Sequence, residues 1–142
     1  RTDVPPGKVM FELAESSAVE QLTVVQEFMR SLREFGCRFS LDDFRAGQAS
    51  FAYLKNLPVD RVKIDGALVR DVTVGDQECA MVRSVNEIAH FMGKETIAEL
   101  VDDPAILEKL VELGVDHAQG YCIQRPIPLA DLVEKLDSGA IF

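Results

Sequence analysis

The chain has 142 residues, of which 47% are hydrophobic and 27% charged, and its formal net charge at pH 7 is −9. This composition is typical of one globular domain, and no stretch reaches the roughly 18 apolar residues of a membrane-spanning helix. The acidic balance, without a cluster of lysines and arginines, argues against a nucleic-acid polymer as partner. We therefore expect a cytoplasmic protein that would need cations to handle a phosphate ester.

The first elements along the chain are a strand and an amphipathic helix. Apolar and polar residues alternate over residues 8–15, which predicts a strand with Glu12 on its more polar face. Ser17 and Glu20 then match a capping box, and the apolar residues that follow at helical spacing predict a helix ending at Gly36.

The rest of the chain continues the alternation of strand and helix. We expect strands at 39–44, 60–64, 95–101 and 118–123, and helices at 50–54, 77–93, 104–114 and 129–136. Asp103 followed by Pro104 is a strong helix start, an N-cap with proline at the first helical position. Five such units predict an α/β fold with a parallel sheet, either a barrel or a doubly wound sheet.

Polar side chains at the predicted strand ends favour the barrel. One such residue lies at or near the carboxyl end of each predicted strand, namely Glu12, Asp42, Lys63, Glu99 and Gln119. Active sites of (β/α)₈ barrels are built at that rim. Any one of these residues could be a solvated strand terminus, but five in succession are harder to explain that way.

The adjacent residues Asp42 and Asp43 are a candidate metal site. Two neighbouring carboxylates repel each other, and a divalent cation with oxygen ligands relieves that repulsion. The alternative is that the pair opens a turn or caps a helix, which is the commoner role of two aspartates. The three cysteines, Cys37, Cys79 and Cys122, are widely spaced and without a CxxC pair, so we expect buried structural thiols and no zinc site.

Several longer motifs resemble those of the EAL domain, a family of cyclic di-GMP phosphodiesterases. They are FELAES, LDDFRAG, YLKNLPVDRVKID, IAELVDD and QGYCIQRPIP, and they extend over nearly the whole chain. The resemblance implies a TIM-type (β/α)₈ barrel and hydrolysis of cyclic di-GMP to linear pGpG with magnesium or manganese. Two cations would activate a water and neutralise charge on the phosphoryl oxygens.

The resemblance also implies roles for individual residues. Metal ligands would be Glu12, Asp42 and Glu99, with Asp43 at a second cation. Lys63 would contact the attacking water, which makes it catalytic together with Glu99, and Gln119 would line the nucleotide or metal site. We expect Arg45 and Asp102 to bind the substrate beside Gln119.

The chain departs from the family in length and in one loop pattern. A (β/α)₈ barrel needs roughly 250 residues, so residues 1–142 are expected to be a single-domain fragment, five β/α units from the C-terminal portion of an EAL barrel. Arg45 and Leu100 replace family glycines, and Asp102 replaces a glutamate. A side chain at position 100 is a problem if the backbone there takes a positive φ.

Three interpretations remain open at this point. The chain is part of a metal-dependent phosphodiesterase that is inactive as this piece alone, a degenerate EAL domain that binds cyclic di-GMP or a protein as a receptor, or a structural module. We also expect self-association, because a sheet of five strands leaves two unpaired edges.

Overall fold

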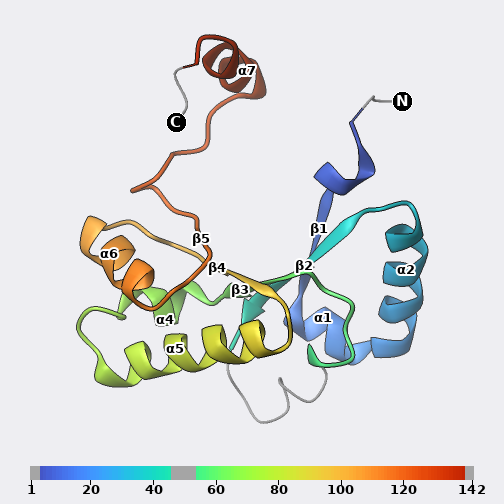
Figure 1. Ribbon diagram of the computed structural model, residues 1–142, viewed down its shortest axis with the longest axis horizontal. Coiled ribbons are helices and arrows are strands. Elements are labelled where there is room, and N and C mark those ends of the chain that lie inside the picture. Colours follow the sequence, from blue (N-terminus) through green and yellow to red (C-terminus); the bar gives the residue numbers. More distant parts are fainter. Residues whose placement is uncertain (1–3, 46–53, 140–142) are drawn as a thin grey trace.

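The protein is described by a computed structural model that covers residues 4–45 and 54–139. Its centre is one sheet of five strands in the order β1-β2-β3-β4-β5, with every neighbouring pair parallel (Figure 1). The strands are β1 Met10–Ala14, β2 Arg38–Phe44, β3 Arg61–Ile64, β4 Glu95–Ala98 and β5 His117–Ala118. Sequential parallel pairing requires a crossover after each strand, and helices supply these crossovers in the described part of the chain.

The helices pack beside the strands that they connect. They are η1 Pro6–Lys8, α1 Glu15–Glu20, α2 Leu22–Glu34, α4 Gly66–Arg70, α5 Asp76–Phe91, α6 Pro104–Glu112 and α7 Leu129–Asp137. Figure 1 shows α1 and α2 next to β1 and β2, with α4, α5 and α6 beside β3 to β5, while α7 stands away from the sheet. The predicted α/β fold with parallel strands is therefore confirmed, and none of the described helices is long and apolar enough to cross a membrane.

The hydrophobic core lies between the sheet and its helices. Phe39 and Leu41 on β2 and Val62 and Ile64 on β3 are fully buried, and they pack with Val82, Val85 and Ala89 of α5 and Met29 of α2. Each such side chain contributes about 1.5–3 kcal/mol by leaving water. Because strand side chains alternate, burying these residues turns Asp42 and Lys63 to the other face of the sheet.

The predicted capping box is wrong. The first helix begins at Glu15 with Ala14 as its N-cap and no side-chain cap, so Ser17 lies inside α1. The backbone then breaks at Gln21 (φ −131°, ψ 43°), and α2 begins at Leu22. The single predicted helix is therefore two helices, since β1 runs almost directly into α1 and leaves no turn for Ser17 to cap.

Other boundaries differ at the carboxyl ends of the last strands. The fourth strand ends at Ala98, and the fifth covers only His117 and Ala118. Residues 119–123 instead turn around Val101, which donates its N–H to Gln119 O (3.0 Å) and accepts from Cys122 N (3.1 Å). The helix α4, whose N-cap is Asp65, was not predicted, and the helix expected at 50–54 lies mostly outside the described residues.

A polar network joins three elements at the amino ends of β4 and β5. Asp116 Oδ2 accepts a hydrogen bond from the backbone N–H of Thr96 at 2.7 Å and lies 2.7 Å from His90 Nε2. The Thr96 hydroxyl lies 2.5 Å from Asn86 Oδ1, and Asn86 Nδ2 donates to the carbonyls of Leu113 and Gly114, each at 3.1 Å. Asn86 and Thr96 are buried, so these bonds satisfy groups that water does not reach.

The three cysteines are free and only half-buried. The expected thiols are therefore present, but their full burial was a wrong prediction.

Candidate functional site

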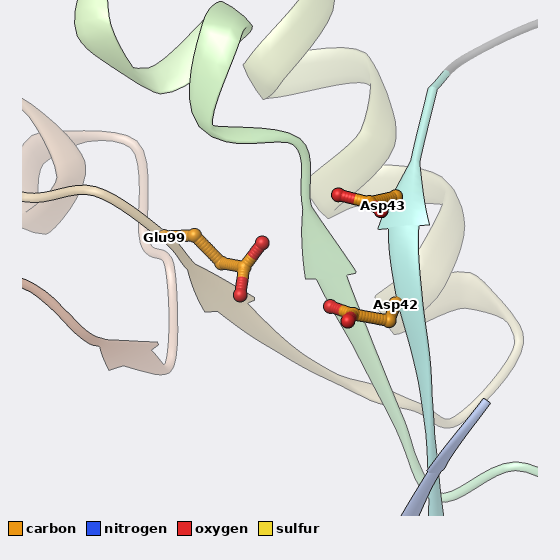
Figure 2. A group of neighbouring side chains, drawn as sticks. All are labelled: Asp42, Asp43 and Glu99. Carbon is orange, nitrogen blue, oxygen red and sulfur yellow. The ribbon is translucent and has the colours of Figure 1, made fainter. Parts of the chain in front are cut away.

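The carboxyl ends of β2, β3 and β4 bring charged side chains to one place. Asp42 and Asp43 end β2, Lys63 lies in β3, and Glu99 follows the last residue of β4. Ile64 pairs with Ala98 in the parallel register, so Glu99 continues just past the end of β3. Figure 2 shows the Glu99 carboxylate pointing across the end of β3 toward the two aspartates.

Asp42, Asp43 and Glu99 form a group that we call the carboxylate cluster. Each offers an oxygen, and these oxygens all lie within 4.8 Å of one another (Figure 2). Adjacent residues in a regular strand point to opposite faces. Here the pairing of β2 with β3 shifts register between Leu41 and Phe44, and Asp43 takes a positive φ of 56°, which together allow both aspartates to face Glu99.

Lys63 is the cation at the centre of this site. Its Nζ lies 2.6 Å from Glu99 Oε1, 3.0 Å from Asp42 Oδ1 and 3.1 Å from Glu12 Oε2, while its side chain is only 4% exposed. Glu12 thus joins the site through Lys63 and is not a member of the carboxylate cluster. One buried ammonium faces three carboxylates, so the site has excess negative charge.

The charges of the site shift two pKa values. Burial acts to lower the pKa of Lys63, but the carboxylates of Glu99, Asp42 and Glu12 outweigh it and raise that pKa above its ordinary value. Lys63 is therefore an ammonium at neutral pH, a donor of hydrogen bonds and not a base. Burial raises the pKa of Glu99, against the opposing effect of Lys63 and with a further rise from Asp42 and Asp43.

The carboxylate cluster fits a divalent cation. Asp42 Oδ1 is buried and, although it lies 3.0 Å from Lys63 Nζ, it accepts no hydrogen bond of acceptable geometry from the described residues. A buried anionic oxygen left in this state is destabilising unless something else coordinates it. Mg²⁺ and Mn²⁺ prefer carboxylate oxygens, so a cation held by Asp42, Asp43 and Glu99 would coordinate an oxygen that otherwise has only the Lys63 ion pair.

A cavity of about 720 Å³ opens beside the carboxylate cluster. The three predicted substrate residues, Gln119, Arg45 and Asp102, all line it. Gln119 is held in place by its backbone, since its N–H donates to Ala98 O at 2.8 Å. Asp102 Oδ1 accepts the Tyr121 N–H at 3.0 Å, so it also fixes the loop that carries Gln119.

Arg45 and Leu100, the two residues that replace family glycines, contact adjacent positions of the chain, Asp65 and Gly66. Arg45 Nε donates to the carboxylate of Asp65, and the Leu100 side chain lies so close over Gly66 that a Cβ there would clash with Leu100 Cδ1. Leu100 has a positive φ of 53°, so the expectation of a special backbone at this position is confirmed. Alternation along residues 61–65 predicts that Asp65 lies on the same face as Lys63, but the sequence gave Asp65 no specific role and did not single out Gly66, which follows it.

These observations define the class: an α/β protein with a carboxylate cluster, a candidate cation site, at the carboxyl ends of parallel strands. The model of the EAL domain family matches residues 1–126, and the chain therefore belongs to that family. Its five strands and helical crossovers form part of the TIM-type barrel of EAL domains.

Individual relatives agree with this assignment. The chain is 42% identical over 136 residues to the cyclic di-GMP phosphodiesterase PdeB of Shewanella oneidensis, covering 96% of this chain and 16% of that protein. Among solved structures, the EAL domain of Mycobacterium smegmatis DcpA has a TM-score of 0.87 at 29% identity, with 96% of this chain and 61% of that chain covered. The chain thus spans less than two thirds of that EAL domain.

A third similar structure contains ligands. Klebsiella pneumoniae BlrP1, solved as a complex with manganese and cyclic di-GMP, has a TM-score of 0.81 at 28% identity, with 87% of this chain and 31% of that chain covered.

Proposed function

We propose that this chain is the C-terminal part of a phosphodiesterase domain that hydrolyses cyclic di-GMP to pGpG with Mg²⁺ or Mn²⁺. The observation that carries the proposal is the carboxylate cluster beside a buried, protonated Lys63, at the mouth of a cavity large enough for a nucleotide. The names of the similar phosphodiesterases and the manganese and cyclic di-GMP complex support the choice of ligand.

Each residue of the site has a role in this proposal. Asp42 and Glu99 hold one cation and Asp43 contacts a second, while Glu12 approaches the same place through Lys63. When bound, the cations place positive charge beside the phosphodiester and make water more acidic. Lys63, which can only donate hydrogen bonds, orients the attacking water and balances negative charge. The catalytic residues are therefore Lys63 and Glu99.

The substrate is held by the cavity wall. Gln119 presents an amide to the nucleotide, and Asp102 holds the Gln119 loop through the Tyr121 N–H. Arg45, which lines the same cavity, presents a guanidinium. Asp102 therefore acts on the substrate through the loop that it fixes.

Incubation with cyclic di-GMP and Mn²⁺, followed by chromatography, tests the enzyme. A protein that carries the whole EAL domain should form pGpG, whereas the 142-residue chain alone should form none, because it provides about half of the domain. Formation of pGpG by the purified chain would contradict the second expectation, and binding without cleavage by the whole protein would contradict the first.

The second candidate function is a receptor that binds cyclic di-GMP without cleaving it. Leu100 favours it, since a leucine with positive φ directly after Glu99 can hold that carboxylate away from the geometry that hydrolysis needs. Under this alternative the whole protein binds cyclic di-GMP but yields no pGpG, and Leu100→Gly with Arg45→Gly would restore activity.

We also propose that the isolated chain associates with itself. β1 and β5 are the edge strands of the described sheet and have free pairing groups on their outer sides. Sedimentation at micromolar concentration should show a dimer or larger, and a stable monomer would contradict the proposal. A cytoplasmic location remains a prediction.

A further inference from the structure

Arg45 is held in position but keeps most of its hydrogen-bonding capacity. Its side chain is 73% exposed and lines the cavity beside the carboxylate cluster. Among the described residues, the guanidinium makes one hydrogen bond, from Nε to Asp65. A guanidinium has five N–H donors, and within residues 4–45 and 54–139 no partner uses those on Nη1 and Nη2, so they can serve a ligand.

The residues around Arg45 fix its direction. Asp65 is only 5% exposed and is itself anchored, because its Oδ1 accepts the Ala67 N–H at 2.7 Å. The Arg45 backbone N–H donates to Glu15 Oε2 at 3.2 Å, which holds the other end of the residue. An arginine that is pre-oriented in this way loses little side-chain entropy when it binds an anion.

The charge balance of the cavity indicates which anionic group Arg45 would bind. The carboxylate cluster repels phosphate, and Lys63 is already surrounded by three carboxylates. Cations held by the cluster can neutralise one phosphodiester group, but a cyclic dinucleotide has two. Among the described residues that line the cavity, the basic side chains are Arg45 and Arg70, and only Arg45 has a carboxylate that orients it.

We propose that Arg45 binds the second, uncleaved phosphodiester group of a cyclic dinucleotide, with Asp65 as the residue that positions it. The inference rests on the proposed function, since it needs a ligand with one phosphodiester at the carboxylate cluster. Arg45 then determines specificity: it favours a ligand with two phosphodiesters over one with a single phosphodiester.

The first test is binding by calorimetry in Mg²⁺, with cyclic di-GMP and with bis(4-nitrophenyl) phosphate, which has one phosphodiester. Arg45→Gln keeps an N–H donor for Asp65 but removes the charge and the fork, and should weaken cyclic di-GMP binding about tenfold or more. Binding of the single phosphodiester should not change. Arg45→Lys should also weaken cyclic di-GMP binding, because a lysine keeps the charge but not the fork.

Two controls separate this effect from loss of charge or of folding. Arg30→Gln makes the same charge change at an exposed position on α2, away from the cavity, and should leave binding unaltered. Mn²⁺ affinity, measured by electron paramagnetic resonance, should stay the same in Arg45→Gln, since Arg45 is not a metal ligand. Asp65→Asn should weaken cyclic di-GMP binding less than Arg45→Gln does.

A ³¹P spectrum of bound cyclic di-GMP provides a direct signature. The two phosphorus atoms are equivalent in the free ligand and should give two resonances in the complex, one of which returns toward the free position in Arg45→Gln. Equal binding and equal spectra for wild type and Arg45→Gln overturn this inference alone. If a protein that carries the whole EAL domain binds Mn²⁺ but not cyclic di-GMP, the proposed function fails and this inference fails with it.

Discussion

Two ion-pair groups lie on the same strands. One is at the carboxyl ends of the strands, which we call the carboxyl edge, and the other is at their amino ends, which we call the amino edge. At the carboxyl edge, Lys63 is buried and faces Glu99, Asp42 and Glu12. At the amino edge, Arg61 pairs with Glu95 at 2.7 Å, and His117 lies 3.2 Å from the same carboxylate. The first group has several carboxylates for one cation, whereas the second has one carboxylate between two basic groups.

The backbone shows the same contrast. Asp43 and Leu100, the non-glycine residues with positive φ in the described chain, both lie at the carboxyl edge. Strained backbone and uncompensated charge are destabilising, so they persist where something else requires them. The carboxyl edge of this sheet is thus arranged for a ligand, and the amino edge for stability, as in other barrels of this kind.

The largest expected effect comes from removing the lysine of the carboxyl edge. In a protein that carries the whole EAL domain, Lys63→Ala should lower turnover of cyclic di-GMP by about a hundredfold or more, while nucleotide binding stays nearly intact. Arg61→Ala, two residues earlier on the same strand, should leave turnover almost unchanged. Steady-state kinetics measures turnover in both variants. Equal losses of turnover in Lys63→Ala and Arg61→Ala would contradict the difference between the carboxyl and amino edges.

The second-largest difference between the two edges should be in the effect of a substitution on metal affinity. Glu99→Gln removes a charged ligand from the carboxylate cluster and should weaken Mn²⁺ binding by about tenfold or more, because carboxylates are the preferred ligands and an amide is neutral. Glu95→Gln makes the same change four residues earlier and should have no effect. Titration of the chain with Mn²⁺, followed by electron paramagnetic resonance, measures both, and equal affinities for both variants would rule out the cluster as the metal site.

The contact between Leu100 and Gly66 should show a smaller effect. Gly66→Ala places a Cβ against the Leu100 side chain and should lower the free energy of unfolding by about 1–3 kcal/mol, as overpacking does. Leu100→Gly relieves backbone strain but loses packing, so its own effect should be under about 1 kcal/mol. The double variant should recover most of the loss in a urea titration, and simple additivity would show that the two residues are not coupled.

The smallest effects concern pH. Burial raises the pKa of Glu99, so protons should compete with Mn²⁺ and metal affinity should fall as the pH drops through that raised value, above the ordinary 4.5. Hydrogen bonds from Arg61 and His117 lower the pKa of Glu95. The stabilisation that Glu95 contributes is therefore present above its unfolded-state pKa and is lost as the pH falls through its lowered folded-state pKa. The loss should be under about 1 kcal/mol, because the Arg61–Glu95 pair is partly exposed.

Carboxyl ¹³C resonances measure both groups in one titration. The Glu99 resonance should move at a higher pH than the Glu95 resonance, and the reverse order would contradict the assignment of the two edges.

The sequence was sufficient for much of the fold because the periodicity of the apolar residues reflects the core directly. Phe39 and Leu41 on one predicted strand and Val62 and Ile64 on the next are apolar and fully buried. The motif residues Asp42, Asp43, Lys63 and Glu99 also come together, because parallel strands place their carboxyl ends at one edge.

Other features depend on contacts that no local pattern contains. The two aspartates share a direction because β2 shifts register against β3 and Asp43 takes a positive φ, and the fifth strand is short because the chain after Ala118 turns around Val101. The capping-box pattern at Ser17 was overridden because α1 already begins at Glu15. Where tertiary hydrogen bonds compete with local signals, the tertiary bonds decide.

The Asp116 network has a consequence for how the molecule opens. Asn86 and His90 on α5, Thr96 at the start of β4, and Asp116 before β5 share hydrogen bonds, so none of these segments can detach without breaking bonds of the others. Segments tied in this way open together as one cooperative unit. We therefore expect the amide hydrogen of Thr96, which is bonded to Asp116, to exchange slowly with solvent, and we expect the strand that leads to Glu99 to open together with its neighbours.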